Sequence, residues 1–159
     1  ANGPVNLSVP LESGRNQHSL IKDVRISVKE NWQSRHWKTI QSCYNRSPFF
    51  VFYSPDLEEL YRKKFQFLWD WNLACCEWAI QKLRVSIEVN FSTDYQPLYD
   101  ETSYDDWRGR ILPKNKPNPG EYPVYRQVFE ERLGFLPNLS ILDLMFCQGT
   151  QAMEILQKA

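Results

Sequence analysis

The sequence predicts an α+β fold, in which a small mixed or antiparallel sheet packs against a long aromatic-rich helix and C-terminal helices. Three segments alternate apolar and polar residues, as strands buried on one face do. Elsewhere the apolar residues recur at the spacing of amphipathic helices. The 159 residues, of which 42% are hydrophobic and 24% charged, are enough for one core, so we expect a single domain over residues 1–159.

The strands are expected at residues 5–11, 20–27 and 85–91. In the first two, β-branched and apolar residues alternate with polar ones on either side of Ser13 and Gly14, a pair typical of turns. In the third, VSIEVNF, two Val, an Ile and a Phe alternate with polar residues. We therefore expect these segments to form a sheet.

A helix with an apolar aromatic face is expected at residues 31–45. Ser54 and Pro55 then predict a helix start, with the serine as N-cap and the proline at the first helical position. A single helix over residues 56–83 would be about 42 Å long, so we expect it either to span the molecule or to break near Lys64.

The C-terminal part is expected to contain two short helices. Asn138 can cap one over residues 139–146, and Thr150 can cap another that runs to Lys158. Residues 92–125, before these helices, are rich in Pro, Tyr and charged residues. Loops this long are uncommon inside compact domains and are often functional.

Composition and motifs exclude several classes of function. Nineteen basic and nineteen acidic residues give no net charge, so we expect no nucleic-acid partner. The most apolar run, residues 65–80, is too polar to insert into a membrane because it contains Gln66, Asp70, Asn72 and Glu77. The chain has no phosphate-binding glycine loop, nucleophile elbow or zinc-protease motif, and we expect no cofactor.

The four cysteines, Cys43, Cys75, Cys76 and Cys147, lack the spacing of a zinc site. We expect them to be reduced, which is typical of a cytoplasmic protein. A disulfide between Cys43 and Cys147 is the alternative.

His36 is the strongest candidate for chemistry, because it lies near the middle of the apolar face of the helix predicted at residues 31–45. Cys43 shares that face, but residues seven apart on one helix are separated by about 10.5 Å along its axis. A thiol and an imidazole that act together must be about 3 Å apart, which excludes a direct dyad. His36 is therefore either a hydrogen-bonded histidine of the core or a catalytic or ligand-binding residue.

Asp143 lies in the apolar run LSILDLMF, where a carboxylate must find a partner or lose its charge. It is therefore either part of a buried ion pair or helix cap, or a residue of a pocket. Lys22 and Asp23 are adjacent in the second predicted strand and would point to opposite faces, so at least one of them is expected to meet the core side.

Arg108 and Trp107 lie in the charged segment SYDDWRGRILPK. Arg108 can bind a phosphate or carboxylate through two hydrogen bonds, while Trp107 stacks on a ring of the ligand. The alternative is internal pairing between arginine and aspartate that only holds the loop. Asp105 and Asp106 are adjacent and lack further spaced carboxylates, so we expect no metal site.

Four segments together resemble the WbqC-like family of bacterial proteins: IKDVRIS at residues 21–27, HWKTIQSCYNRSPFFVFY at 36–53, RGRILPK at 108–114 and YRQVFEERLGFLPNLSILDLMFCQG at 125–149. They occur in the family's order across nearly the whole chain. Members usually begin with a further segment of several tens of residues, so the resemblance implies a domain that is incomplete at its N-terminus.

The resemblance implies a protein of bacterial surface-polysaccharide (O-antigen) biosynthesis that modifies a nucleotide-linked amino sugar by acyl or aminoacyl transfer. His36 would act as the general base in a pocket that also contains Asp143, Lys22 and Asp23, with Arg108 as the anion anchor. The alternative is a non-catalytic binding or scaffold protein of the same pathway. The sequence leaves open whether the chain is an enzyme, and it does not indicate an oligomeric state.

Overall fold

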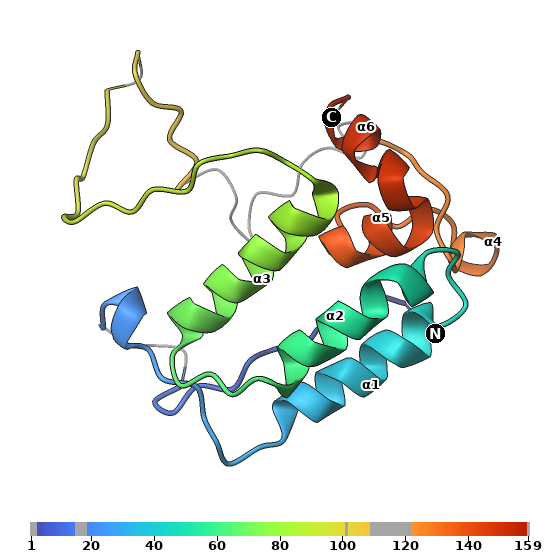
Figure 1. The fold of residues 1–159 in the computed structure, drawn as a ribbon, viewed down its shortest axis with the longest axis horizontal. Coiled ribbons are helices and arrows are strands. Elements are labelled where there is room, and N and C mark those ends of the chain that lie inside the picture. The colour runs from blue at the N-terminus through green and yellow to red at the C-terminus, as the bar shows by residue number, and fades with distance from the viewer. Residues whose placement is uncertain (1–2, 15–18, 101, 109–121, 159) are drawn as a thin grey trace.

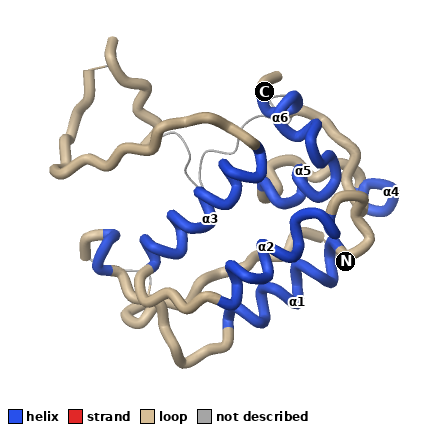
Figure 2. Tube along the Cα trace, viewed as in Figure 1, coloured by secondary structure: helices blue, strands red, loops and turns tan. Residues whose placement is uncertain are grey.

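Helices make up the regular structure of this chain. A computed structural model describes residues 3–14, 19–100, 102–108 and 122–158. Figure 1 shows the elements, which are η1 (Ile21–Asp23), α1 (Trp32–Tyr44), α2 (Phe50–Arg62), α3 (Leu68–Leu83), α4 (Glu130–Leu133), α5 (Ile141–Gln148), η2 (Gly149–Gln151) and α6 (Ala152–Leu156). The η elements are single 3₁₀ turns. No strand element occurs in the described residues (Figure 2).

The predicted α+β fold is therefore wrong. Among the described residues, only two isolated antiparallel bridges, Leu11 with Ile26 and Arg25 with Phe67, link extended segments. Residues 85–91 join no ladder in the part of the chain that is described. An alternating pattern specifies a half-buried extended segment, and helices can cover its apolar side as well as a second strand can. That is the outcome at Ile26, which is 2% exposed and belongs to the core of the helices.

The helix predicted at residues 31–45 is confirmed as α1, which Asn31 and Asn45 flank. Its buried residues are Trp32, His36, Trp37 and Ile40, which recur at helical spacing. The polar residues between them face away from the core, so the pattern alone was sufficient to locate this helix.

The predicted start of the next helix is wrong, because α2 begins at Phe50 and Pro55 is its sixth residue. Tertiary contacts explain the earlier start. The backbone N–H of Phe49 donates to the carbonyl of Phe146 at 3.0 Å, and the rings of Phe50 and Phe146 lie 5.1 Å apart. These contacts hold the chain in a helical turn before Ser54, which therefore lies inside the helix and is not its N-cap.

The predicted break near Lys64 is confirmed, because residues 63–67 separate α2 from α3. The N–H of Ile26 donates to the carbonyl of Gln66 at 2.9 Å, so an N-terminal extended segment holds this linker. The break lets α3 turn back and contact α2, which a single rod over residues 56–83 could not do.

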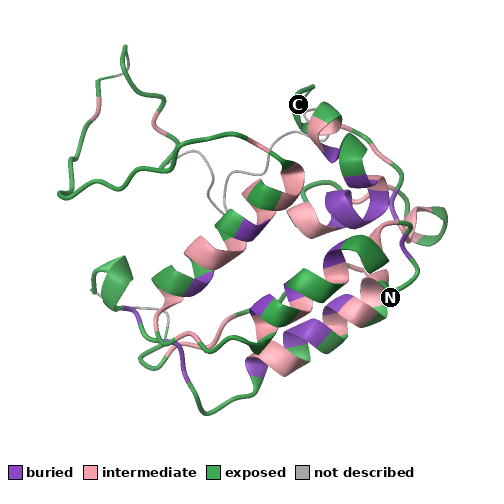
Figure 3. Ribbon diagram, viewed as in Figure 1, coloured by how far each residue is buried: buried purple, intermediate pink, exposed green. Residues whose placement is uncertain are grey.

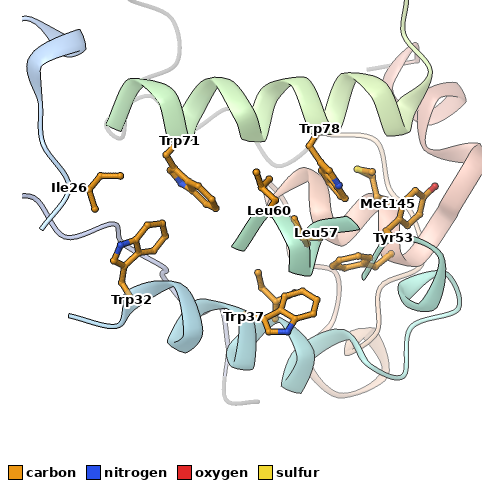
Figure 4. Close-up of a cluster of buried hydrophobic side chains, with 11 residues drawn as sticks. Ile26, Trp32, Trp37, Tyr53, Leu57, Leu60, Trp71, Trp78 and Met145 are labelled. Atoms are coloured by element: carbon orange, nitrogen blue, oxygen red, sulfur yellow. The ribbon is translucent and has the colours of Figure 1, made fainter. Parts of the chain in front are cut away.

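The core lies between α3 on one side and α1, α2 and α5 on the other. Trp71 and Trp78 project from α3 towards the other helices, and Leu57 and Leu60 of α2 lie between α3 and α1 (Figure 4). Many core contacts place the edge of one aromatic ring against the face of another. The ring centroids of Trp32 and Trp71, for example, lie 5.0 Å apart in this arrangement. Buried positions follow the inner faces of α1, α2 and α5 (Figure 3).

The C-terminal helices are present but begin later than predicted. Ser140, and not Asn138, caps α5, because its side-chain oxygen accepts a hydrogen bond from the N–H of Leu142 at 3.3 Å. Asn138 instead adopts a left-handed backbone conformation with φ of 57°. Gly149 ends α5, also with φ of 57°, and any side chain at this position would collide with the ring of Phe49.

Candidate functional site

A cavity of about 500 Å³ lies among the N-terminal segment, α1, α2, α3 and residues 127–143. Its walls are mainly apolar and include Ile40, Leu57, Leu60, Trp71 and Trp78. Cavities of this size and lining are typical of small-molecule sites. The predicted catalytic residues His36 and Asp143 both line it, so the structure brings them to one cavity.

His36 lies on the inner face of α1 and is 4% exposed. Its Nε2 is 3.1 Å from the carbonyl oxygen of Ser8. A carbonyl oxygen can only accept a hydrogen bond, so the neutral ring carries its proton on Nε2 and a lone pair on Nδ1. The ring packs edge-on against Trp32 at 5.1 Å, which restricts its orientation.

Burial lowers the pKa of His36 below 6.5, although the hydrogen bond to Ser8 opposes this shift and the charge of Arg35 adds to it. His36 is therefore neutral at pH 7. In the described residues, the only sealed side-chain nitrogen or oxygen without a partner is Nε1 of Trp78. Nδ1 of His36 is thus not sealed, and it can accept a proton or a hydrogen bond from a molecule in the cavity.

Asp143 is 3% exposed and lies in the first turn of α5. The hydroxyl of Tyr125 donates to its Oδ2 at 2.9 Å, and the side-chain amide of Gln127 donates to the same atom at 3.1 Å. The Asp143 charge also acts on Tyr44, where it adds to the burial that raises the pKa of that hydroxyl. The two donors to Asp143 are thus uncharged, and no ion pair forms with it in the described part of the chain.

The donors around Asp143 are themselves held in place. Gln127 donates to the carbonyl of Leu136 at 2.8 Å and accepts from the N–H of the same residue at 2.8 Å. Burial, with a contribution from the Asp143 charge, raises the pKa of Tyr44 and of Tyr125 well above the usual tyrosine range. Both hydroxyls thus keep their protons at neutral pH and remain donors.

His36 and Asp143 both line the cavity but are not hydrogen-bonded to each other in the described residues, so they form no dyad. Tyr44, which contacts Asp143, is eight residues after His36 on α1, and this spacing corresponds to about 12 Å along the helix axis. The only hydrogen bond of the His36 ring within the described residues is the one to Ser8. The two groups can therefore act on different parts of one ligand, but Asp143 cannot orient the imidazole.

Lys22 and Asp23 do not contribute to this cavity. Both lie in η1, whose residues are all exposed, so the prediction that one of them faces the core is wrong. The 3₁₀ turn replaces the strand geometry on which that prediction depended. Neither residue lines the cavity.

Arg108 and Trp107 are also outside the cavity. Nη2 of Arg108 is 2.6 Å from Oδ2 of Asp106, and its Nη1 donates to the carbonyl of Gln96 at 2.7 Å. The guanidinium group lies 4.7 Å from the centroid of the Tyr99 ring. Trp107 is 55% exposed. Arg108 thus makes the internal pairing that was the alternative to anion binding. Residues 109–114 of the RGRILPK segment lie outside the described residues.

The cysteines are all free. Burial raises the pKa of Cys75 and of Cys147 to about 12, so neither is a thiolate at neutral pH. Cys43 and Cys75 line the cavity as small apolar groups. In the described residues, no cluster of three or more potential metal ligands occurs.

Sequence reasoning missed the residues that surround Asp143. Tyr44 lies on α1, and the Asp143 charge that adds to its raised pKa comes from a segment far along the chain. Tyr125 and Gln127 fell in or beside the long loop, where no pattern indicated a buried role. Ser8, the partner of His36, acts through its backbone carbonyl, for which the side chain gives no signal.

A family model for the WbqC-like protein family matches residues 1–114. The chain belongs to the WbqC-like family. The match includes His36 and the three long helices, while Asp143, Tyr125 and Gln127 lie beyond it. No curated protein and no solved structure matches the chain. None of the helices in the described residues is long and apolar enough to cross a membrane.

Proposed function

We propose that this WbqC-like chain binds a small molecule of bacterial surface-polysaccharide (O-antigen) biosynthesis in its cavity and transfers an acyl or aminoacyl group to a nucleotide-linked amino sugar. The observation that carries the proposal is the position of His36, a neutral imidazole with an unsealed Nδ1 at the wall of an aromatic cavity. The free cysteines support a reducing compartment such as the cytoplasm.

His36 suits the role of general base. As the amine nitrogen of the sugar attacks the carbonyl carbon of an activated acyl donor, the new C–N bond forms and the bond to the leaving group breaks. Nδ1 of His36 takes the proton that the amine loses. The bond from Nε2 to Ser8 holds the ring during this step and favours the proton-accepting tautomer.

The charge of the cavity limits which part of the substrate enters. No Lys or Arg of the described residues lines it, and the Asp143 carboxylate is a negative group on its wall. A diphosphate would therefore be repelled. The proposal thus places the sugar or acyl portion in the cavity and leaves the nucleotide outside it.

Incubation of the chain with UDP- or dTDP-linked amino sugars and activated acyl or aminoacyl donors tests the proposal, with mass spectrometry of the sugar as the measurement. We expect the sugar to gain the mass of the acyl group. His36→Gln should abolish the product, because glutamine can still donate to Ser8 but has no basic nitrogen. Lys38→Ala is the matched control, since Lys38 is exposed on the outer face of α1. Product formation by His36→Gln at the unaltered rate would contradict the assigned role.

A non-catalytic binding protein of the same pathway is the second candidate. It is favoured by the absence of an activated nucleophile in the described lining, where Cys75 is protonated and His36 has no acidic partner. A ligand that binds only the folded state raises its melting temperature. If a sugar nucleotide raises the melting temperature but no acyl donor yields a product, the result would support binding and exclude transfer.

A further inference from the structure

Asp143 is the one formal charge on the described lining of the cavity. The other polar groups of that lining are neutral, because His36 has a lowered pKa and the rest are hydroxyl, amide and thiol side chains. A carboxylate this deeply buried is costly unless its charge is compensated. The described residues compensate it with hydrogen bonds but with no cation.

The hydrogen bonds to Asp143 leave acceptor capacity unused. An ionised carboxylate has about four lone-pair sites, and two donors, Tyr125 and Gln127, bind Asp143, both at Oδ2. Asp143 lines the cavity, so its remaining acceptor sites are within reach of a molecule bound there.

We propose that the natural ligand of this cavity carries a protonated primary amine, and that this ammonium group binds Asp143. The inference rests on the proposed function only in taking the same cavity as the ligand site. An ammonium ion supplies the missing positive charge and donates a charge-assisted hydrogen bond, which is stronger than one between neutral groups. A carboxylate or phosphate beside Asp143 would be repelled.

The rest of the cavity defines the remainder of the ligand. Much of the wall is aromatic and aliphatic, with Tyr61, Trp71 and Trp78 among the lining residues. His36 also lines the cavity, and because its Nε2 is bound to Ser8, its Nδ1 can accept a hydrogen bond from a ligand. The lining therefore fits a molecule with an ammonium group, an apolar part and a separate hydrogen-bond donor.

A matched pair of probes tests this inference in the unaltered chain. Aminohexanol has an amine and a hydroxyl at opposite ends of its carbon chain, and hexanediol is its neutral counterpart. The amine is protonated at neutral pH, because alkylamines have pKa values of about 10. We expect calorimetry to show aminohexanol binding at least about tenfold more tightly than hexanediol, which is a difference of about 1.4 kcal/mol. Equal affinity of the two probes, or binding of neither at millimolar concentration, would overturn the inference.

Substitutions test whether the charge of Asp143 causes the preference for aminohexanol over hexanediol. Asp143→Asn should reduce the preference for aminohexanol to less than about twofold, since an amide keeps the shape of the side chain but not its charge. Tyr125→Phe, which removes one donor and leaves the carboxylate, should retain the preference. Asp70→Asn is the control, because Asp70 is an exposed carboxylate on α3. An unchanged preference in a folded Asp143→Asn protein would assign the amine to another site and overturn the inference.

The test of this inference and the test of the proposed function can give different results. If the chain prefers aminohexanol but transfers no acyl group, the inference stands and the enzymatic proposal fails. If it transfers acyl groups but shows no preference between the two probes, the enzymatic proposal stands and the inference fails.

Discussion

The helical body and the arm of this protein both contain large apolar and aromatic residues, but only the body buries many of them. The helical body consists of α1, α2, α3 and α5, and the arm consists of residues 85–100 and 102–108. In the body, Met145 and Phe146 are 0% exposed, whereas Tyr95 and Leu98 of the arm are 83% and 85% exposed. The arm extends away from the helices (Figure 1) and is exposed along most of its length (Figure 3).

The difference shows that an apolar pattern is buried only where a complementary surface meets it. A helix satisfies its own backbone, so its apolar stripe needs only another apolar face. A strand also needs a neighbour for its N–H and C=O groups, and residues 85–91 have no such neighbour in the described part of the chain. The start of the arm contacts α3, where the N–H of Val85 donates to the carbonyl of Ile80 at 3.1 Å and the rings of Phe91 and Trp69 lie 5.6 Å apart.

Phe146→Ala should cause the largest loss of stability and so test the body most strongly. Its ring lies 5.1 Å from those of both Tyr44 and Phe50, and the substitution leaves a cavity among them. We expect the free energy of unfolding to fall by about 3–5 kcal/mol. Urea unfolding followed by circular dichroism measures it. Tyr95→Ala in the arm is the control and should change stability by less than about 0.5 kcal/mol. Similar losses for the two variants would contradict the division into body and arm.

Gln127→Ala should have the next largest effect. It leaves the half-buried N–H and carbonyl of Leu136 without their partner and removes one donor from Asp143. We expect a loss of about 2–3 kcal/mol in the free energy of unfolding, because unsatisfied buried polar groups are costly. Gln96→Ala in the arm is the matched control, since only its backbone carbonyl makes a hydrogen bond. A Gln127→Ala protein as stable as the control would show that the network around Asp143 is dispensable for folding.

The pH dependence of stability tests whether His36 is buried in the helical body. Burial lowers its folded pKa below 6.5, so the unfolded state binds a proton more readily than the folded state. The neutral imidazole therefore leaves folding unopposed above about pH 6.5, and stability is lost as the pH falls through the lower folded pKa of His36. The melting temperature of the unaltered chain should therefore fall more between neutral pH and about pH 5 than that of His36→Gln. Parallel pH profiles for the two proteins would show that the imidazole is not buried.

Arg108→Ala should have the smallest effect on global stability. The pair with Asp106 is largely exposed and close in sequence, and such pairs contribute about 0–1 kcal/mol. We expect little change in unfolding but faster chymotrypsin cleavage at the arm tyrosines, because Arg108 contacts the rings of Tyr95 and Tyr99. The control Arg62→Ala removes an ion pair on α2, in which the arginine is more exposed, and should leave cleavage of the arm unchanged. A large loss of unfolding free energy in Arg108→Ala would mean that the arm is part of the core.

The candidate site was predictable only in part, and for a specific reason. Helical periodicity placed His36 on a buried face, and the position of Asp143 in an apolar run indicated that its carboxylate needs partners. Both residues line the cavity. The choice of those partners depends on loops: Tyr125 and Gln127 reach Asp143 from a segment whose composition indicated only a loop. Lys22 and Asp23 were misplaced because their strand is a 3₁₀ turn.

The sequence by itself determined the helix at residues 31–45, with its one-sided apolar pattern, and the family of the chain, and it named a break near Lys64 as one of two outcomes for the next helix. These features depend on local periodicity, chain length and residue identity, all of which can be read along a single segment. Only the tertiary structure decided that the alternating segments form no sheet in the described residues, that α2 begins before Ser54, and that Asp143 is surrounded by uncharged donors. Each of these outcomes depends on a contact between segments distant in the chain, and a pattern within one segment carries no information about which partner meets it.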